Sequence, residues 1–218
     1  MAWHQSLGLG EMNYRYHDHL KLAHYANAAC DIEFRFPMGF KELEGIHSRT
    51  DFDLKAHEEY SGRKLHYFDP HSNQSYIPYV IETSVGLDRL FLAVLSAAYT
   101  EEKLPDGSER TVLKIPAFIA PVKIAIFPLL KKEGLPEKAN LIWRDLSLYF
   151  QCQYDEKDAV GRRYRRQDAI GTPYCITVDG ESVKSNSVTV RERDSMAQVR
   201  VSVDELINHL SKTLSSGV

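Results

Sequence analysis

The chain has 218 residues, of which 43% are hydrophobic and 26% are charged, with a formal net charge of −3 at pH 7. This composition is that of a globular protein and excludes disordered and collagen-like chains. No segment approaches the roughly 18 apolar residues of a membrane span, and Met1-Ala-Trp-His-Gln lacks a signal-peptide pattern. The three cysteines (Cys30, Cys152 and Cys175) are too far apart for a zinc motif. We therefore expect a cytoplasmic protein with reduced thiols and no membrane partner.

The first part of the chain predicts an α+β domain with an antiparallel sheet. A helix is expected over residues 19–30 because Leu20, Ala23, Ala26 and Cys30 follow a helical spacing. Alternating or apolar segments at 31–36, 40–46 and 76–82 predict strands. The last strand continues through Ser84, turns at Gly86 and enters a helix whose apolar stripe would pack against the sheet.

A domain boundary is expected at about residue 115. Pro105-Asp-Gly107 is a turn signal within a charged segment, and two prolines shortly afterwards prevent a continuous helix. The predicted domains are therefore 1–114 and 115–218. In the second, strands are expected at 122–127, 151–154, 174–178, 187–191 and 198–203, and helices at 136–150, 160–170 and from Ser202, with Glu205 completing a capping box. This alternation predicts a small mixed α/β sheet.

The junction between the strand through Glu82 and the following helix concentrates polar groups. Glu82 and Ser84 are two apart, so both side chains should lie on one side of the strand. Gly86 would allow a close approach to a ligand, and Arg89 offers donors suited to phosphate. These residues point to a site for a small amine and a phosphate. The alternative is an ordinary strand–turn–helix corner with a surface Arg–Asp pair.

Several segments resemble known sequences. Gly86-Leu-Asp-Arg89 before a Leu/Phe-rich helix is similar to motif 3 of class II aminoacyl-tRNA synthetases. Segments 42–54, 57–62 and 79–84 resemble the homodimeric glycyl-tRNA synthetases, and 120–128 and 161–174 are similar to the anticodon-binding domain of the same enzymes. The resemblance implies part of a class II catalytic domain followed by a five-stranded mixed sheet. It also implies glycine, ATP, Mg²⁺ and tRNA(Gly) as ligands, and a homodimer for the full-length enzyme.

The resemblance assigns roles residue by residue in the first domain. Glu82 and Ser84 would receive the amino group of glycine, with Gly86 beside them. Glu42, Leu43, Gly86 and Arg89 would contact ATP, and Glu42 would hold Mg²⁺.

Neighbouring residues are expected to support these roles. Glu42 and Glu44 are two apart in a strand, so both carboxylates could face one cleft, although an exposed acidic edge explains them equally well. Asp88 is expected to orient Arg89. Arg49 is expected to form an ion pair with Asp51 or Asp53.

The second domain carries the candidate tRNA contacts. Arg162, Arg163, Arg165 and Arg166 form the densest basic run, which would contact RNA phosphates. Arg191, Arg193 and Thr189 lie in the predicted hairpin and are candidates for base recognition. The alternative for the basic run is a solvated helix face with acidic partners.

No segment matches motif 1 or motif 2, which carry the dimer interface and the α-phosphate contact of class II enzymes. We therefore expect that this chain alone does not form glycyl-adenylate. A free-standing RNA- or protein-binding module derived from such an enzyme is the alternative function.

Overall fold

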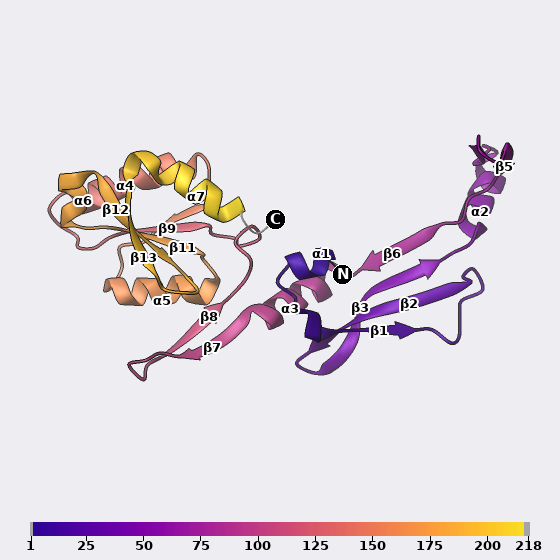
Figure 1. Cartoon of the computed structure of the whole chain (residues 1–218), viewed down its shortest axis with the longest axis horizontal. Coiled ribbons are helices and arrows are strands. Elements are labelled where there is room, and N and C mark those ends of the chain that lie inside the picture. Colours follow the sequence, from indigo (N-terminus) through magenta and orange to yellow (C-terminus); the bar gives the residue numbers. More distant parts are fainter. Residues whose placement is uncertain (1, 216–218) are drawn as a thin grey trace. The chain divides into compact units, whose positions relative to one another are not determined.

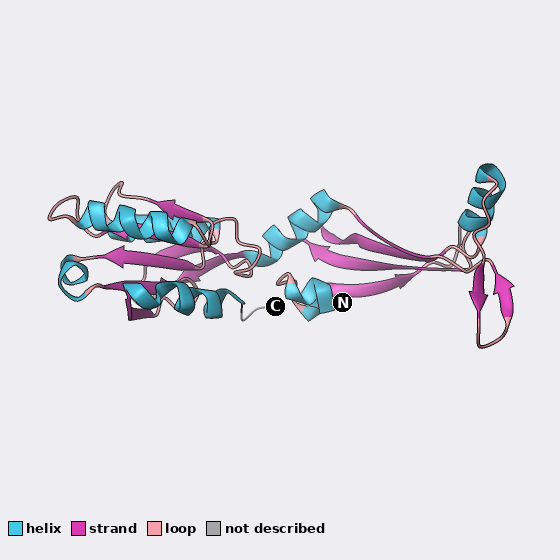
Figure 2. Ribbon diagram, turned by 90° about the horizontal axis from the view of Figure 1, so that it is seen from above, coloured by secondary structure: helices cyan, strands magenta, loops and turns pink. Residues whose placement is uncertain are grey.

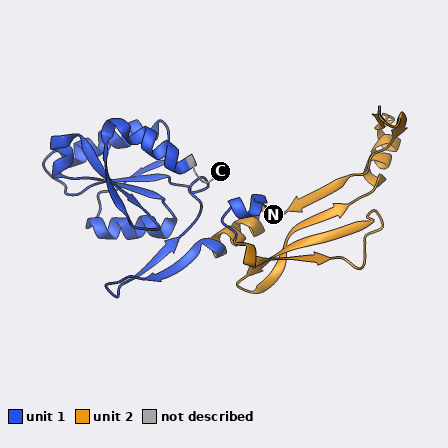
Figure 3. Cartoon of the chain, viewed as in Figure 1, with its two compact units in different colours: residues 1–9, 97–218 blue, residues 10–96 orange. Residues whose placement is uncertain are grey.

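The computed structural model describes residues 2–215 and contains two compact units. One comprises residues 10–96 and the other residues 1–9 together with 97–218 (Figure 3). The sequence predicted a division at about residue 115, so the compact units divide earlier than expected. The reason lies in the hairpin at residues 99–113, described below.

The unit at residues 10–96 is built on a four-stranded antiparallel sheet, as predicted (Figure 1). Its strand order is β1-β2-β3-β6, with β1 at Tyr14–Asp18, β2 at Ala28–Phe36, β3 at Gly39–Ser48 and β6 at Ile81–Val85. Between β3 and β6 the chain forms helix α2 (Phe52–Ser61) and a small hairpin of β4 (Tyr67–Asp69) and β5 (Gln74–Tyr76). A 3-10 turn, η1 (Glu11–Asn13), precedes β1.

The helix predicted at residues 19–30 is wrong. Tyr14–Asp18 pairs with β2 as far as Cys30, so residues 28–30 are strand and the preceding residues form the connection. Leu20, the first apolar residue of the supposed helical face, is fully exposed. Without a surface for that face to bury, backbone pairing with the neighbouring strand determines the conformation.

Helix α3 (Leu87–Ala98) follows β6, as the sequence predicted. Its apolar stripe is only partly covered, because Leu87 is 78% exposed and Phe91 is 63% exposed. Ala93 on the same helix is fully buried. The expectation that the whole stripe packs against the sheet is therefore wrong for its N-terminal half.

The other unit contains the expected five-stranded mixed sheet, in the order β10-β9-β11-β12-β13. Its strands are β9 (Ile124–Pro128), β10 (Cys152–Tyr154), β11 (Tyr174–Val178), β12 (Ser187–Glu192) and β13 (Gln198–Ser202). Strand β9 pairs in parallel with β10 and β11, whereas β12 is antiparallel to its neighbours. Helices lie on both faces, as Figure 2 shows. These are α4 (Leu135–Ser147), α5 (Val160–Ile170), α6 (Gly180–Ser185) and α7 (Leu206–Ser215), with the short α1 (Ala2–Ser6) also in this unit.

The sheet alternates between two faces. Ile124, Ile126, Ile176 and Val190 belong to the main core, which also includes residues of α4 and α7. The opposite face buries a smaller cluster in which Val160 and Tyr164 of α5 pack against Ala125, Phe127 and Cys175.

The last helix begins differently from the prediction. Ser202 precedes a 3-10 turn, η2 (Val203–Glu205), and its side chain forms no capping hydrogen bond. A capping box is present instead at α6, where Asp179 and Ser182 each accept from the other's backbone N–H.

The hairpin of β7 (Tyr99–Lys103) and β8 (Glu109–Leu113) explains the position of the unit boundary. The Arg110 side chain is 1% exposed and donates to Asp168, which is fully buried in α5, at 3.2 Å. Arg110 also donates to the backbone carbonyls of Arg193 and Asp194. At Gly171, which has a φ of +85°, any Cβ would lie 2.8 Å from Ile115. The hairpin and the segment after it thus pack into the unit formed by residues 1–9 and 97–218.

Asp168→Asn should destabilise this unit strongly. The substitution keeps the side-chain size but removes the buried charge that faces Arg110 and Arg191, and breaking such a pair costs about 3–5 kcal/mol. Urea unfolding followed by circular dichroism measures the loss. Asp204→Asn, at an exposed carboxylate of η2, is the control. A loss below about 0.5 kcal/mol, the size typical of surface changes, would contradict this role for Asp168.

Candidate functional site

The pairing of β3 with β6 places the predicted glycine-site residues. Glu82 lies opposite His47 and Ser84 lies opposite Gly45. Glu82 and Ser84 therefore share one side of β6. Gly45 has no side chain, and the space that a Cβ would take is filled by the His47 ring, whose Cε1 would lie 3.0 Å from it. Ser84 itself is exposed.

Arg49 links Glu82 to helix α2. Its guanidinium donates to Asp53 through Nε at 2.6 Å and Nη2 at 3.0 Å, and Nη1 donates to Glu82 Oε2 at 2.8 Å. The guanidinium also lies over the Tyr25 ring, 4.1 Å from its centroid. The predicted ion pair with Asp53 is confirmed, whereas Asp51 pairs with Lys55. The hydrogen bonds from Arg49 lower the pKa of the Asp53 carboxyl below its usual range.

Gly86 stands at the turn between β6 and α3. Its φ is not in the left-handed region, and an added Cβ would meet only Arg89 Cβ at an ordinary 3.8 Å. The described chain therefore does not itself require glycine at this position. Glycine at this position leaves space beside the backbone, where a ligand could approach closely.

Arg89 and Glu42 are brought together from α3 and β3. Arg89 Nη1 donates to the backbone carbonyl of Glu42 at 2.7 Å and lies 3.8 Å from its carboxylate. Both residues line a cavity of about 360 Å³ together with Phe36, Met38, Lys41 and Leu92. The prediction that Asp88 orients Arg89 is not supported, because Arg89 donates its hydrogen bond to the Glu42 carbonyl instead. Glu82, Ser84 and Gly86 do not line this cavity.

The argument that Glu42 and Glu44 face one cleft fails at a β-bulge. Glu44 pairs with Ile32 and Glu42 pairs with Glu33, leaving Leu43 without a partner in the ladder. Side-chain alternation does not hold across such an irregularity. Leu43 is buried, as expected, at 2% exposure.

Glu42 offers one largely exposed carboxylate beside the Arg89 cavity. Among residues 2–215, no group of three or more His, Cys, Asp or Glu residues could hold a metal ion. A single carboxylate fits Mg²⁺ where phosphates and water supply the other ligands, so Glu42 is compatible with that ion.

The arginines predicted to contact tRNA divide into two groups. Arg163, Arg191 and Arg193 are buried. Arg163 donates to the Pro128 carbonyl and Arg193 to the carbonyls of Ile115 and Gly171. These three guanidinium groups are thus bonded inside the unit.

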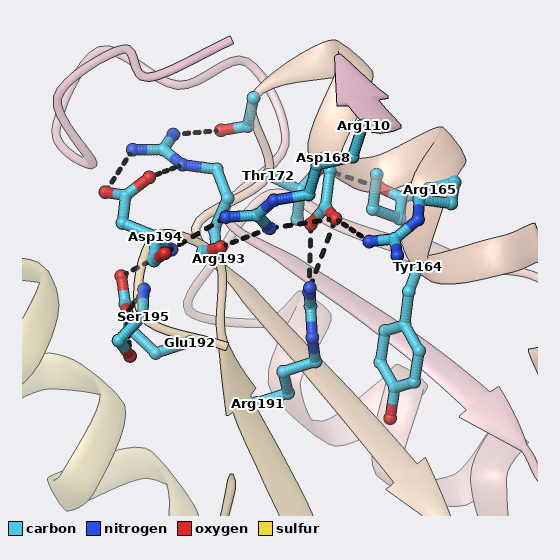
Figure 4. Close-up of polar contacts among 12 residues, drawn as sticks. Arg110, Tyr164, Arg165, Asp168, Thr172, Arg191, Glu192, Arg193, Asp194 and Ser195 are labelled. Atoms are coloured by element: carbon cyan, nitrogen blue, oxygen red, sulfur yellow. Dashed lines mark hydrogen bonds and ion pairs between the residues drawn. The ribbon is translucent and has the colours of Figure 1, made fainter. Parts of the chain in front are cut away.

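Three arginines converge on Asp168, as Figure 4 shows. Arg191 donates to both carboxylate oxygens, at 2.9 and 3.1 Å, and Arg110 donates at 3.2 Å. Arg165 is more distant, at 3.4 Å, and its side chain is 40% exposed. The sequence analysis missed Arg110, which lies in no recognisable motif. It considered Asp168 only as an acidic partner on a solvated helix, whereas the structure buries this carboxylate completely.

The remaining members of the basic run are accessible. Arg166 forms ion pairs with Asp155 and Asp158, which lie just before the N-terminal end of α5. Arg162 is exposed. The interpretation of the basic run as a helix face with acidic partners is therefore correct for Arg166.

No helix in the described part of the chain is long and apolar enough to cross a membrane.

Comparison with known proteins supports the fold described above. Residues 123–213 match the family model described as "Anticodon binding domain". A prolyl-tRNA synthetase from Cryptosporidium parvum, solved with L-proline and AMP, aligns with 98% of this chain and 45% of its own, with a TM-score of 0.66 and 15% identity. This likeness shows the fold alone, an antiparallel sheet followed by a mixed five-stranded sheet.

Sequence relatives are more specific. Glycine–tRNA ligases from Chlorobaculum tepidum and Geobacillus kaustophilus are 50% and 51% identical, over 96% and 98% of this chain. The one from Treponema denticola is 48% identical over 99% of it. The chain spans about half the length of these relatives, between 44% and 49%. The chain therefore belongs to the glycyl-tRNA synthetase family, of which it represents a C-terminal part.

Proposed function

We propose that this chain forms part of an enzyme that activates glycine with ATP and transfers it to tRNA(Gly). The observation that carries the proposal is identity of about 50% to glycine–tRNA ligases along nearly the whole chain. The paired β3–β6 strands and the β6–α3 junction supply groups of the right chemistry. In this reaction a glycine carboxylate oxygen attacks the α-phosphate and pyrophosphate leaves. A ribose hydroxyl of tRNA then attacks the glycyl carbonyl and AMP leaves.

Glu82 and Ser84 would hold the glycine ammonium group. Arg49 occupies one carboxylate oxygen of Glu82, Oε2, which leaves Oε1 for the ammonium. Because Arg49 is itself fixed by two bonds to Asp53, it would restrict the orientation of Glu82. Positioning of this kind can supply a large part of the rate in a reaction that needs little acid–base chemistry.

Arg89, Gly86, Leu43 and Glu42 would contact ATP. Arg89 would give a charge-assisted hydrogen bond to phosphate, while the Glu42 carbonyl holds its guanidinium in place. Leu43 can contribute only through its backbone, since its side chain lies in the core. Mg²⁺ bound at Glu42 would neutralise phosphate charge.

The anticodon-binding domain would bind tRNA(Gly), with Arg162, Arg165 and Arg166 as the accessible members of the predicted basic set. Burial of Arg163, Arg191 and Arg193 favours a role for them in shaping the domain rather than in direct contact. A homodimer for the full-length protein and a cytoplasmic location remain predictions. The free-standing binding module is not favoured, because the matched relatives are ligases along the entire alignment.

A chimera tests the ligase proposal. Its N-terminal part comes from the Geobacillus kaustophilus relative, up to the start of the aligned region, and this chain follows. The chimera should charge tRNA(Gly) with glycine.

Arg89→Ala should lower kcat/KM by about 10- to 100-fold, the loss of one charge-assisted bond of about 1.5–3 kcal/mol. The Gly86→Ala chimera should fold normally, because the added methyl group meets only Arg89 Cβ at an ordinary distance. It should lose activity, because that methyl group would occupy space that the ligand needs. Lys55→Ala, at an exposed lysine of α2, is the control. If the Arg89→Ala chimera kept the kcat/KM of the unaltered chimera, the proposal that Arg89 binds phosphate would be wrong.

The 218-residue chain by itself should show no pyrophosphate exchange with ATP and glycine, because the α-phosphate contact of class II enzymes has no counterpart in it. Incorporation of labelled pyrophosphate into ATP measures this. Steady turnover that scales with protein concentration would refute the expectation.

Arg49→Gln should raise the pKa of Asp53 towards the ordinary value of about 3.9, because the two hydrogen bonds that favour the carboxylate are lost. Carbon-detected NMR of the Asp53 carboxyl across a pH series measures the change. Lys55→Gln, which leaves Arg49 in place, should not move it. An unchanged Asp53 titration in Arg49→Gln would disprove the coupling.

A further inference from the structure

The unit formed by residues 1–9 and 97–218 contains a cavity of about 410 Å³, and none of the residues assigned above to glycine, ATP or tRNA lines it. Lys123 and Gln151, the residues just before β9 and β10, both line it, so it lies at the edge of the sheet where these strands begin. The Lys123 backbone N–H donates to the Gln151 carbonyl at 2.8 Å and holds the two residues together. The other walls come from the segment after β8, the C-terminal end of α4 with its following loop, and α7.

Apolar side chains make up most of the cavity wall. Leu148 and Tyr149 are 80% and 63% exposed, so apolar surface also faces solvent beside the cavity. Aromatic and aliphatic walls with a few polar groups are typical of sites for small organic molecules, and the volume is in the range of such sites. The apolar lining residues are Ala117, Phe118, Leu148, Tyr149, Phe150 and Leu214.

Among the described residues that line the cavity, Lys123 alone carries a charge. Its Nζ donates to the backbone carbonyls of Ala117 and Phe118, at 2.8 and 2.7 Å. A lysine ammonium group has three N–H donors, so these two bonds leave one donor for a ligand. Both acceptors are neutral and do not cancel the charge. Burial lowers the pKa of the Lys123 ammonium group, and within residues 2–215 no neighbouring carboxylate opposes this shift.

The charge of Lys123 and the apolar walls together define the chemistry of a ligand. A partly buried charge is costly unless a group of opposite charge compensates it. A carboxylate in the cavity would accept the third N–H of Lys123, and charge-assisted hydrogen bonds of this kind are stronger than neutral ones. The apolar walls would exclude a small hydrated anion and favour a ligand that also has an apolar body. The site therefore suits an organic anion with a ring.

We propose that this cavity binds a small aromatic carboxylate, with its carboxylate on Lys123 Nζ and its ring against Phe118 and Tyr149. Offset or edge contacts between aromatic rings would add to the apolar area that the ligand buries. The inference goes beyond the proposed function, because it uses none of the groups assigned to glycine activation or tRNA binding.

The test uses the 218-residue chain and a pair of probes of the same shape, para-trifluoromethylbenzoate and the neutral para-trifluoromethylbenzamide. Fluorine NMR of each probe, titrated with protein at neutral pH, gives Kd. The benzoate should bind about tenfold more tightly than the benzamide, because only the benzoate carries a charge that Lys123 can pair with. Equal affinities for the wild type would contradict the inference.

Two variants locate the site. Lys123→Met keeps a long side chain but removes the charge, so it should abolish the preference for benzoate and leave benzamide binding close to that of the wild type. Ser211→Phe places a ring in the cavity from an exposed position of α7 and should weaken both probes. This second variant keeps the two hydrogen bonds of Lys123, so it still tests the site if Lys123→Met disturbs the segment around Ala117.

Lys184→Met is the matched control, because it removes an exposed lysine of α6 that does not line the cavity. It should bind both probes like the wild type, and circular dichroism checks the fold of every variant. If Lys123→Met keeps the preference for benzoate, or if Ser211→Phe binds both probes like the wild type, the probes bind elsewhere and the inference is wrong.

The chimera described above should show the same preference for benzoate. Loss of binding in the chimera would mean that its N-terminal part covers the cavity, and this result would also overturn the inference. Because the measurement is probe binding and not glycine charging, its failure would leave the proposed function intact.

Discussion

The antiparallel pairing of β3 with β6 is the constraint on which the candidate catalytic site depends. It brings together residues about forty positions apart, with Ser84 opposite Gly45 and Glu82 opposite His47. The same arrangement places Arg89, at the start of α3, within hydrogen-bonding distance of the Glu42 carbonyl. A one-residue shift in this register would turn Glu82 and Ser84 to the other face. Backbone pairing thus brings to the junction groups of β3 that the local sequence around Gly86 does not contain.

In the anticodon-binding domain the corresponding constraint is the buried charge of Asp168. A fully buried carboxylate is tolerable only when it is well paired, and three arginines from β8, α5 and β12 provide that pairing. One consequence is architectural, because Arg110 joins the β7–β8 hairpin to the domain. The other is electrostatic, because Arg110 also pairs with a second carboxylate, Glu102 of β7, at 2.6 Å. The same guanidinium therefore fixes the hairpin and balances charge inside the domain.

Two of the failed predictions share one cause. Apolar spacing at residues 19–30 is compatible with a helix, but the strand that pairs with Tyr14–Asp18 uses part of that segment. Strict alternation suggested one cleft for Glu42 and Glu44, but a bulge lies between them. In each case a contact distant in sequence overrode a local pattern.

The sequence by itself determined the family, the mixed five-stranded sheet and the strand–turn–helix junction around Gly86. The family and the number of strands follow from the resemblance of several segments to known synthetases. The mixed character of the sheet and the junction follow from apolar periodicity and from local turn chemistry, which a few neighbouring residues specify. Only the tertiary structure decided which arginines are buried. Arg162 and Arg163 are adjacent in the chain and chemically identical, yet one is exposed and the other donates to the Pro128 carbonyl. The difference comes from the side of α5 that packs on the sheet, and that depends on strands assembled from distant parts of the chain.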